Sequence, residues 1–303
     1  MKLVVTGASG FIGRELRKLN INNVSYISRS NTVDNNFFKI GDIDSDTDWS
    51  ILRHIDADCL IHLAGLAHSN VFSELDILKV NYEGTINLAE HCAQYGVKRF
   101  IYISSIGVVG NRNSTTPINE SMMEKPEGIV NHYKLLTENA LRRIEENTGL
   151  EVVIIRPPMV YGSNAPANFD KFFKLVKFLR ILPFGRVRNL QDFVYVENLV
   201  DFILLCSHNS NAAGKTFMVS DCHSISLLDF SKEIADSLGK KCINIPIPLV
   251  FFDIFFRLIN RPNIASNFLR PQRVDMTYTK KHTGWIPPFN LKQAIKKTGS
   301  NYD

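Results

Sequence analysis

Residues 4–16 read VVTGASGFIGREL, and this stretch decides the fold. A short apolar run leads into three glycines, Gly7, Gly10 and Gly13, and then into a helix-like pattern. At a strand-to-helix turn, Gly7 permits the tight turn, Gly10 lets the backbone approach a pyrophosphate, and Gly13 lets the helix pack on the strand. The unpaired N–H groups at the helix start would then hold the anion. The loop therefore predicts a dinucleotide site, with a purely structural turn as the alternative.

Near-continuous apolar runs recur in the first half of the chain: KLVVT, VSYIS, CLIHLAG, RFIYISS and VVIIRP. Such runs are typical of strands buried on both faces of a parallel sheet. Helix-like stretches separate them, which predicts an α/β fold with a doubly wound parallel sheet of the Rossmann type. The pattern loosens in the second half. We expect a dinucleotide-binding domain at 1–160 with a returning segment at about 190–221, and a smaller C-terminal substrate-binding domain at 161–189 and 222–303.

Composition narrows the class of protein. The chain has 303 residues, 45% of them hydrophobic, and a mild formal charge of +5, which favours a small anionic ligand over nucleic acid. The five cysteines are dispersed, with no CxxC pair and no His/Cys metal spacing. This predicts reduced thiols in a cytoplasmic protein and no metal site. The start of the chain runs directly into a strand-like segment, so we expect no signal peptide.

One apolar segment needs a separate explanation. Residues 245–259 read IPIPLVFFDIFFRLI, but prolines, Asp253 and Arg257 interrupt the run, so we do not expect it to span a bilayer. We interpret it as an amphipathic helix buried in a core or at a subunit contact. Attachment to a membrane surface is the less favoured alternative.

The second apolar run ends in YISRS, residues 26–30. An acidic residue near this place would bind the ribose of NAD. Ser28 stands there instead, and Arg29 follows it. Because arginine can pair with a 2′-phosphate, the sequence favours NADP; if Arg29 is only a surface charge, the cofactor is NAD.

Beyond the glycine loop, further motifs together resemble one family over nearly the whole chain. The family is the extended short-chain dehydrogenase/reductases, and within it the NAD(P)-dependent nucleotide-sugar epimerases, dehydratases and 4-ketoreductases. The motifs are GDID (41–44), HLAGLAH (62–68), VNYEGT (80–85), YISSIGVVG (102–110), RPPMVYG (156–162), NF (168–169), DFVYVENLVD (192–201) and HTGWIPP (282–288).

The resemblance implies a set of binding residues. Those for the cofactor are Gly7, Ser9, Gly10, Phe11, Ile12, Gly13, Arg29, Asp42, Ile43, Leu63, Ala64, Gly65, Asn81, Lys134 and Pro157. For a UDP-sugar, the resemblance implies that Asn168 and Phe169 contact the nucleotide half. Gln191 stands where the family has an arginine, so Arg188, or the nearby Arg186, is expected at the diphosphate.

The catalytic helix departs from the family pattern. Ser105 aligns with the catalytic serine, and KLLTENAL (134–141) aligns Lys134 with the catalytic lysine. The place of the catalytic tyrosine, one helical turn before that lysine, is then held by Val130. The alternative makes Tyr133 the catalytic tyrosine, but it puts Thr137 in the place of the lysine and breaks the downstream match.

Helical periodicity bears on the role of Tyr133. Tyr133, Leu136, Ala140 and Ile144 fall on one apolar stripe, which favours a core or dimer contact over an acid for Tyr133. A proton for the reaction would then come from Tyr133 as a substitute acid, from His132 or from water.

These observations lead to three hypotheses. The first is an enzyme acting at carbon 4 of a UDP-hexose derivative, as a 4-keto-sugar reductase or 4-epimerase of surface-polysaccharide synthesis, in which Ser105 binds the reacting oxygen and Lys134 orients the ribose. The second is a catalytically impaired protein that binds a nucleotide sugar and NAD(P), because Val130 holds the tyrosine position. The third is a sensor of NADP. The resemblance also implies a homodimer formed through the helices at 80–96 and 130–146.

Overall fold

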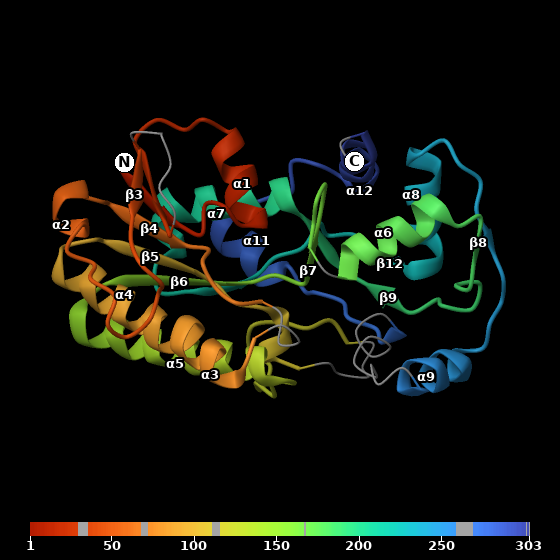
Figure 1. The fold of residues 1–303 in the computed structure, drawn as a ribbon, viewed down its shortest axis with the longest axis horizontal. Helices are drawn as coiled ribbons and strands as arrows, with labels where there is room; N and C mark the ends of the chain where they lie inside the picture. Colours follow the sequence, from red (N-terminus) through yellow and green to blue (C-terminus); the bar gives the residue numbers. More distant parts are fainter. Residues whose placement is uncertain are drawn as a thin grey trace.

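The computed structural model describes residues 1–29, 36–67, 72–110, 116–166, 168–258, 269–300 and 302. One part of the molecule is built on a seven-stranded sheet with the strand order β11-β6-β5-β4-β1-β2-β3 (Figure 1). Its strands are β1 (Leu3–Thr6), β2 (Val24–Ser28), β3 (Phe37–Lys39), β4 (Cys59–His62), β5 (Arg99–Ile103), β6 (Glu151–Arg156) and β11 (Thr216–Met218). Every pairing in this sheet is parallel. The predicted doubly wound sheet is confirmed.

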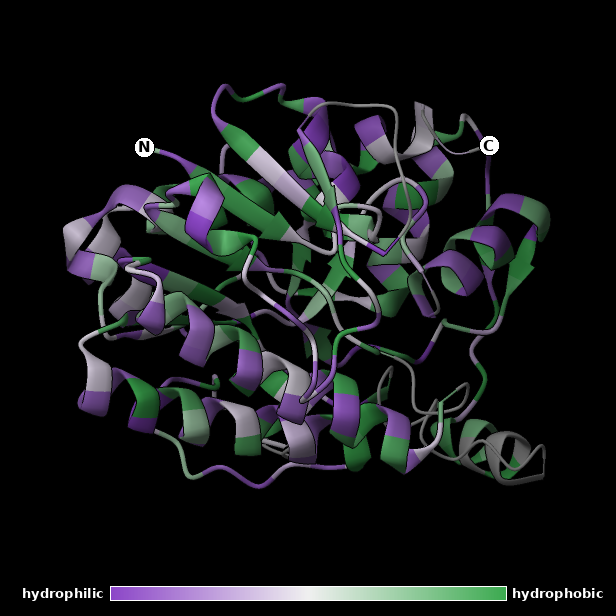
Figure 2. Cartoon of the chain, turned by 60° about the vertical axis from the view of Figure 1, so that its left-hand side comes forward, coloured by the Kyte–Doolittle hydropathy of each residue, from purple (hydrophilic) through white to green (hydrophobic). Residues whose placement is uncertain are grey.

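Helices cover both faces of the sheet because successive strand residues point to opposite sides. Val5 of β1 packs in one core cluster with Leu16 of α1 (Phe11–Lys18) and Phe202 of α7 (Val196–His208). The adjacent Val4 packs in another cluster with Leu88 of α4 (Gly84–Gln94) and Leu141 of α5 (Ile129–Thr148). The hydrophobic strands therefore lie between amphipathic helices (Figure 2).

The strand order reverses beside β1. The chain moves from β1 to β2 and β3 on one side, and then crosses to β4, β5 and β6 on the other. In open α/β sheets, ligands bind at the carboxyl ends of the strands at such a switch point. The topology thus places the candidate site above the ends of β1 and β4.

The remaining elements cover the sheet, line the site or build the second part of the molecule. They are α2 (Leu52–Ile55), α3 (Glu74–Ile77), the π-helical η1 (Leu78–Glu83), the 3₁₀ turns η2 (Ile106–Val108) and η3 (Ser210–Ala212), β7 (Met159–Tyr161), α6 (Asn168–Phe178), β8 (Ile181–Leu182), β9 (Leu190–Gln191), β10 (Phe193–Tyr195), β12 (Ile225–Ser226), α8 (Leu227–Ser237), β13 (Ile243–Asn244), α9 (Leu249–Leu258), α11 (Thr277–Thr283) and α12 (Leu291–Ser300).

A separate aromatic core lies among α6, α8 and α12. It includes Phe169 and Phe173 of α6, Phe230 of α8 and Ile295 of α12. Phe193, from the segment expected to return to the sheet domain, packs in the same core. We propose that the two parts are the two expected domains; their exact limits stay a prediction.

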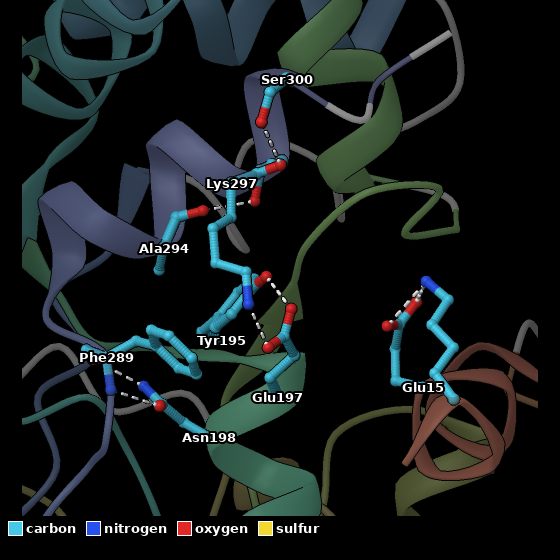
Figure 3. A network of polar contacts seen from close by, with 10 residues as sticks. Glu15, Tyr195, Glu197, Asn198, Phe289, Ala294, Lys297 and Ser300 are labelled. Carbon is cyan, nitrogen blue, oxygen red and sulfur yellow. Dashed lines mark hydrogen bonds and ion pairs between the residues drawn. The ribbon is translucent and has the colours of Figure 1, made fainter. Parts of the chain in front are cut away.

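The C-terminal helix is attached to α7 by polar contacts (Figure 3). Lys297 of α12 pairs with Glu197 of α7 at 2.5 Å, and the Tyr195 hydroxyl donates to the same carboxylate at 2.6 Å. The Asn198 side chain donates to the Phe289 carbonyl at 2.8 Å and accepts from the Phe289 N–H at 2.9 Å. The end of the chain is therefore joined to a helix that covers the sheet.

The segment at 245–259 contains α9, as the sequence predicts. Phe252 stacks on Phe184 of the second core, with ring centroids 6.3 Å apart. Val250, Phe251 and Ile254 are exposed, so the expectation of burial in a core is wrong for these three side chains. Within the described ranges, no helix is long and apolar enough to cross a bilayer.

Candidate cofactor and substrate site

The glycine loop connects β1 to α1, as the sequence predicts. Gly7 has a φ of +74°, and a Cβ there would lie 2.5 Å from the backbone of Leu63 and Ala64. A Cβ on Gly13 would lie 2.3 Å from the Gly7 carbonyl oxygen. At Gly10 the nearest atom is 3.1 Å away, so the protein itself requires this glycine far less than the other two. Its predicted role in admitting a pyrophosphate remains a prediction.

Two adjoining hollows form a trough over the carboxyl ends of the strands. The first, of about 200 Å³, extends from the glycine loop to Arg29 and Asp42. The second, of about 140 Å³, extends to Asn81 and Lys134. They share the segment after β4, residues 63–66. The trough is elongated and begins at a helix N-terminus, which is the shape and the anion-binding end that a dinucleotide requires.

The trough brings together most of the expected cofactor residues. Those lining it are Gly7, Ser9, Gly10, Ile12, Arg29, Asp42, Ile43, Leu63, Ala64, Gly65, Asn81 and Lys134. Phe11, Gly13 and Pro157 do not line it. Sequence reasoning missed Ile27, Ile40, Leu66, Val80, His62, Thr85 and Tyr102, which also line it. Ile27 belongs to an apolar run, and His62, Leu66, Val80, Thr85 and Tyr102 lie within the family motifs HLAGLAH, VNYEGT and YISSIGVVG.

Arg29 and Asp42 lie at the rim of the trough. The Arg29 guanidinium is 3.3 Å from the Asp42 carboxylate, and their side chains are 75% and 79% exposed. An exposed pair of this kind is weak and easily rearranged. A 2′-phosphate would compete with Asp42 for Arg29, whereas Asp42 could accept a hydrogen bond from an unmodified ribose.

Lys134 is fixed at the end of β5. Its ammonium donates to the Ile103 carbonyl at 2.8 Å and to the Ser104 carbonyl at 3.0 Å, and lies 5.7 Å above the centre of the Tyr102 ring. Burial lowers the pKa of Lys134 from 10.5 to about 8, against the opposing effect of Glu138. An ammonium has three N–H donors. In the described part of the chain, the two carbonyls are the only hydrogen-bond acceptors of Lys134.

Tyr133 faces away from this lysine. Its hydroxyl donates to Glu74 of α3 at 3.2 Å, and partial burial together with this hydrogen bond raises its pKa. Leu136, expected on the same apolar stripe, is exposed. Ile144 of the same stripe is buried in the core, so the expectation of core packing holds at that end of the stripe and is wrong for Leu136. A role as a subunit contact stays a prediction. Val130 lies one turn before Lys134 on the same side of α5, where the alignment places it.

Ser105 begins the turn that follows β5. Its hydroxyl oxygen accepts a hydrogen bond from the Gly107 N–H at 3.0 Å. A Cβ on Gly107 would lie 2.5 Å from the Asn131 side chain, so this turn packs directly against the first turn of α5. The Ile106 N–H donates to the Pro157 carbonyl at 3.0 Å. These contacts hold the Ser105 and Lys134 segments in a fixed relation.

A buried ion pair fixes the same side of α5 one turn beyond Lys134. Arg156, at the end of β6, pairs with Glu138 of α5 at 2.5 Å, and both side chains are 4% exposed. Arg156 also pairs with Glu124 at 3.1 Å. Glu138 follows Lys134 by one helical turn, so the pair sets the position of the lysine. Sequence reasoning missed it, although Arg156 opens one of the quoted motifs.

His62 forms the floor of the second hollow. One ring nitrogen lies 2.7 Å from the Thr6 hydroxyl and the other lies 3.0 Å from the Thr85 hydroxyl. Burial, with a smaller effect from Lys134, lowers the pKa of His62 to about 3. The ring is therefore neutral near pH 7, and it adds no positive charge beside the lysine.

The expected substrate residues Asn168, Phe169 and Arg188 belong to the second part of the chain, and none of them lines the trough. Asn168 begins α6, but the Phe169 ring is buried and packs on Tyr161 at 5.6 Å between centroids. A substrate contact from Phe169 would thus come from its backbone. Arg188 and Arg186 are exposed.

Gln191 stands where the family has an arginine, and its side chain does not extend into open space. It is buried and donates to the Arg270 carbonyl at 2.7 Å. The Arg270 guanidinium lies 3.9 Å from Glu127, just before α5. Sequence reasoning missed Arg270, a cation near the start of α5. Its place depends on a hydrogen bond between residues 79 positions apart in the chain.

Known proteins resemble this chain over its whole length. The family described as "NAD dependent epimerase/dehydratase family" matches residues 3–220. A UDP-glucose 4-epimerase of Vibrio cholerae is 34% identical, over 99% of this chain and 95% of that protein.

Solved structures share the fold. The UDP-glucose 4-epimerase of Thermotoga maritima, solved with UDP-glucose, has a TM-score of 0.78 at 23% identity and covers 99% of this chain and 98% of its own. The UDP-glucose 4-epimerase of Thermus thermophilus in complex with NAD has a TM-score of 0.79 at 21% identity, with the same coverage.

Proposed function

The chain belongs to the NAD-dependent epimerase/dehydratase family, and from this premise we propose that it inverts carbon 4 of a UDP-hexose derivative with a nicotinamide cofactor. The observation that carries the proposal is Lys134, held by two carbonyls at the end of β5 and facing the trough. The relative from Vibrio cholerae favours an epimerase over a 4-keto-sugar reductase. A role in surface-polysaccharide synthesis is proposed from the sequence resemblance only.

The residues present fit a dinucleotide. The backbone is close-packed around Gly7 and Gly13, while the space at Gly10 is left open beside the first N–H groups of α1. Gly10 would accommodate the pyrophosphate, and Asp42 or Arg29 would bind the adenosine ribose. Lys134, with two N–H groups held by carbonyls, has one position left, which can serve either the nicotinamide ribose or the sugar oxygen and not both at once. The choice between NAD and NADP depends on whether the Arg29 guanidinium exchanges its ion pair with Asp42 for one with the 2′-phosphate of the cofactor. The sequence favours NADP, and the matched relatives give no support for that preference.

The groups of this chain would act on the sugar as follows. When bound, the cofactor supplies the acceptor and donor of the hydride at carbon 4. The Ser105 hydroxyl donates to the 4-oxygen, since its own lone pair already accepts the Gly107 N–H. The proton of the sugar 4-hydroxyl has to be removed when the hydride leaves carbon 4, and it has to be given back to the 4-oxygen when the hydride returns.

We assign this proton to Lys134. Val130 carries no proton, and Tyr133 donates to Glu74 on another helix. Lys134 has an N–H that no backbone carbonyl takes, and its pKa of about 8 lets it exchange a proton near neutral pH. Neutral Lys134 accepts the hydroxyl proton and returns it when the sugar is reduced from the opposite face.

The test is a set of measurements on the purified chain. Interconversion of UDP-glucose and UDP-galactose, and of the N-acetylated pair, is followed with NAD and separately with NADP. Calorimetric titration with UDP should give a saturable signal that weakens in Asn168→Ala. If UDP gives neither heat nor a thermal shift at millimolar concentration, the proposed substrate class is wrong.

A second candidate function is favoured by one observation, the valine at position 130. It is a protein that binds a nucleotide sugar and NAD(P) without turning the sugar over. Saturable binding of both ligands, with no epimerisation and no hydride transfer in a single-turnover absorbance assay, would support this candidate over the enzyme.

A further inference from the structure

A positively charged hollow lies far from the trough, between the end of α6 and the loop after α8. It has a volume of about 570 Å³, and its charged lining residues are Lys177, Arg180, Lys240 and Lys241. No acidic residue lines it. Among the described residues, the ammonium groups of Lys177 and Lys240 donate to backbone carbonyls. Within the same residues, none of the four cations forms an ion pair.

Exposed apolar side chains border the same hollow. Phe178 is 71% exposed, Ile243 is 63% exposed, and Leu179 lies beside them. Ile181 of β8 is paired with Ile243 of β13, and it is also exposed. Large side chains of this kind are seldom left in water in a group, and such a patch marks a contact surface.

Further exposed apolar side chains follow the hollow's border in the sequence, up to α9. Ile245, Leu249, Val250, Phe251 and Ile254 are all exposed. β8, β13 and α9 lie at the end of the molecule that is farthest from the seven-stranded sheet (Figure 1). We call the hollow, its apolar border and the exposed side chains of 245–254 the basic–apolar end.

We propose that the basic–apolar end docks the protein on the surface of an anionic phospholipid bilayer. Aromatic and aliphatic side chains can enter the boundary between headgroups and acyl chains, while lysine and arginine extend their charged ends to lipid phosphates. Attraction to anionic lipids adds to the apolar contact. The sequence alone did not favour membrane attachment, because exposure along 178–181 and 243–254 is not visible in it.

The positive charge of the hollow favours an anionic bilayer over a second copy of the chain as the binding partner. In a two-fold dimer the same patch meets itself, so the four cations would face four identical cations across the contact. Like charges in such an interface oppose association. An anionic membrane presents the complementary charge instead. The proposal does not depend on the proposed enzyme activity.

Flotation of the full chain with lipid vesicles tests the proposal. The chain should float with vesicles of phosphatidylglycerol and phosphatidylcholine, and not with phosphatidylcholine alone. The pair Arg180→Gln and Lys241→Gln should lower the partition coefficient roughly 25-fold, at about fivefold for each cation removed. Phe178→Ser and Phe251→Ser should each lower it by about tenfold without any change of charge. The matched control is Arg143→Gln with Lys281→Gln, exposed cations on α5 and α11.

The outcomes separate the possible occupants. Equal loss in the control pair would show that net charge alone binds vesicles and would overturn the proposal. Self-association of the wild type that Phe178→Ser abolishes, with no vesicle binding, would assign this end to a second copy. Displacement from vesicles by millimolar inorganic phosphate at constant ionic strength would assign the hollow to free phosphate. Epimerisation of soluble UDP-sugars should be unchanged in all four variants.

Discussion

At the scale of single residues, the main difference from the family pattern is Val130, which stands where the resemblance places the catalytic tyrosine. Val130→Tyr should raise turnover by up to about 10²–10⁴-fold, the usual contribution of a general acid–base, because the new hydroxyl lies one turn from Lys134. The control is Tyr133→Phe, which removes only the bond to Glu74. Initial rates of sugar epimerisation measure both. Loss of activity in Tyr133→Phe, with none gained in Val130→Tyr, would reverse the roles assigned to the two positions.

The protonation of Lys134 predicts the shape of the pH profile. Its pKa is lowered to about 8, so the neutral base is scarce below that pH and predominates above it. We expect kcat/KM to rise with pH and to level off above about 8. Lys134→Arg keeps the charge but cannot release a proton, so its residual activity should be flat over the same range. A wild-type profile that falls through pH 8 would mean that Lys134 acts only as a cation.

Two substitutions can distinguish the roles of Gly10 and Gly13 in the first loop, one in cofactor binding and the other in packing. Gly10→Val should abolish dinucleotide binding yet leave the thermal midpoint nearly unchanged, because a Cβ there meets only one atom at 3.1 Å. Gly13→Val should instead lower the midpoint strongly, since its Cβ would lie 2.3 Å from a backbone oxygen. Calorimetry and thermal melts provide the two readouts. A Gly10→Val chain that binds both NAD and NADP normally would refute the cofactor site.

At the scale of elements, α5 is positioned by a charge pair that no periodicity reveals. Glu138→Gln should destabilise the fold by about 3–5 kcal/mol, because the Arg156 charge stays buried with only the half-exposed Glu124 as partner. Replacing both residues, as Arg156→Met with Glu138→Leu, should recover much of the loss. Urea denaturation measures each variant. If Glu138→Gln alone is as stable as the wild type, other groups neutralise the Arg156 charge.

The strands β1, β2, β4, β5 and β6 could be predicted because each is a short apolar run next to a turn, whereas β3 has only three residues, FFK, and was not predicted. The glycine loop could be predicted because its three glycines form a local pattern. The contacts of α5 could not, because helical periodicity shows which residues share a face and not which element covers it. Tyr133 illustrates this limit: its stripe appears suited to a core, yet its hydroxyl bonds to Glu74, 59 residues earlier. Arg270 comes close to Glu127, just before α5, in the same way, because its carbonyl accepts from Gln191, a residue distant in sequence.

At the scale of the whole molecule, the sequence predicts two parts only because its pattern of apolar runs loosens in the second half of the chain. It does not predict how the second, aromatic core is assembled. Apolar content predicts a second core, but it does not show that Phe193 of β10 packs with helices from three separate parts of the chain. The partners of α9 could not be foreseen either, because composition alone does not distinguish a buried phenylalanine from an exposed one. The homodimer expected through α4 and α5 stays a prediction.

The contacts of α12 with α7 have a consequence for the order of synthesis. The strands of the sheet are complete once β11 has been made, and domains fold from the N-terminus as they emerge from the ribosome. The second core, in contrast, needs Ile295 and Tyr302, and the link to α7 needs Phe289 and Lys297. The ribosome makes these residues after every strand of the sheet. The sheet can therefore form first on the nascent chain, whereas the second core can close only once residues 289–302 have emerged.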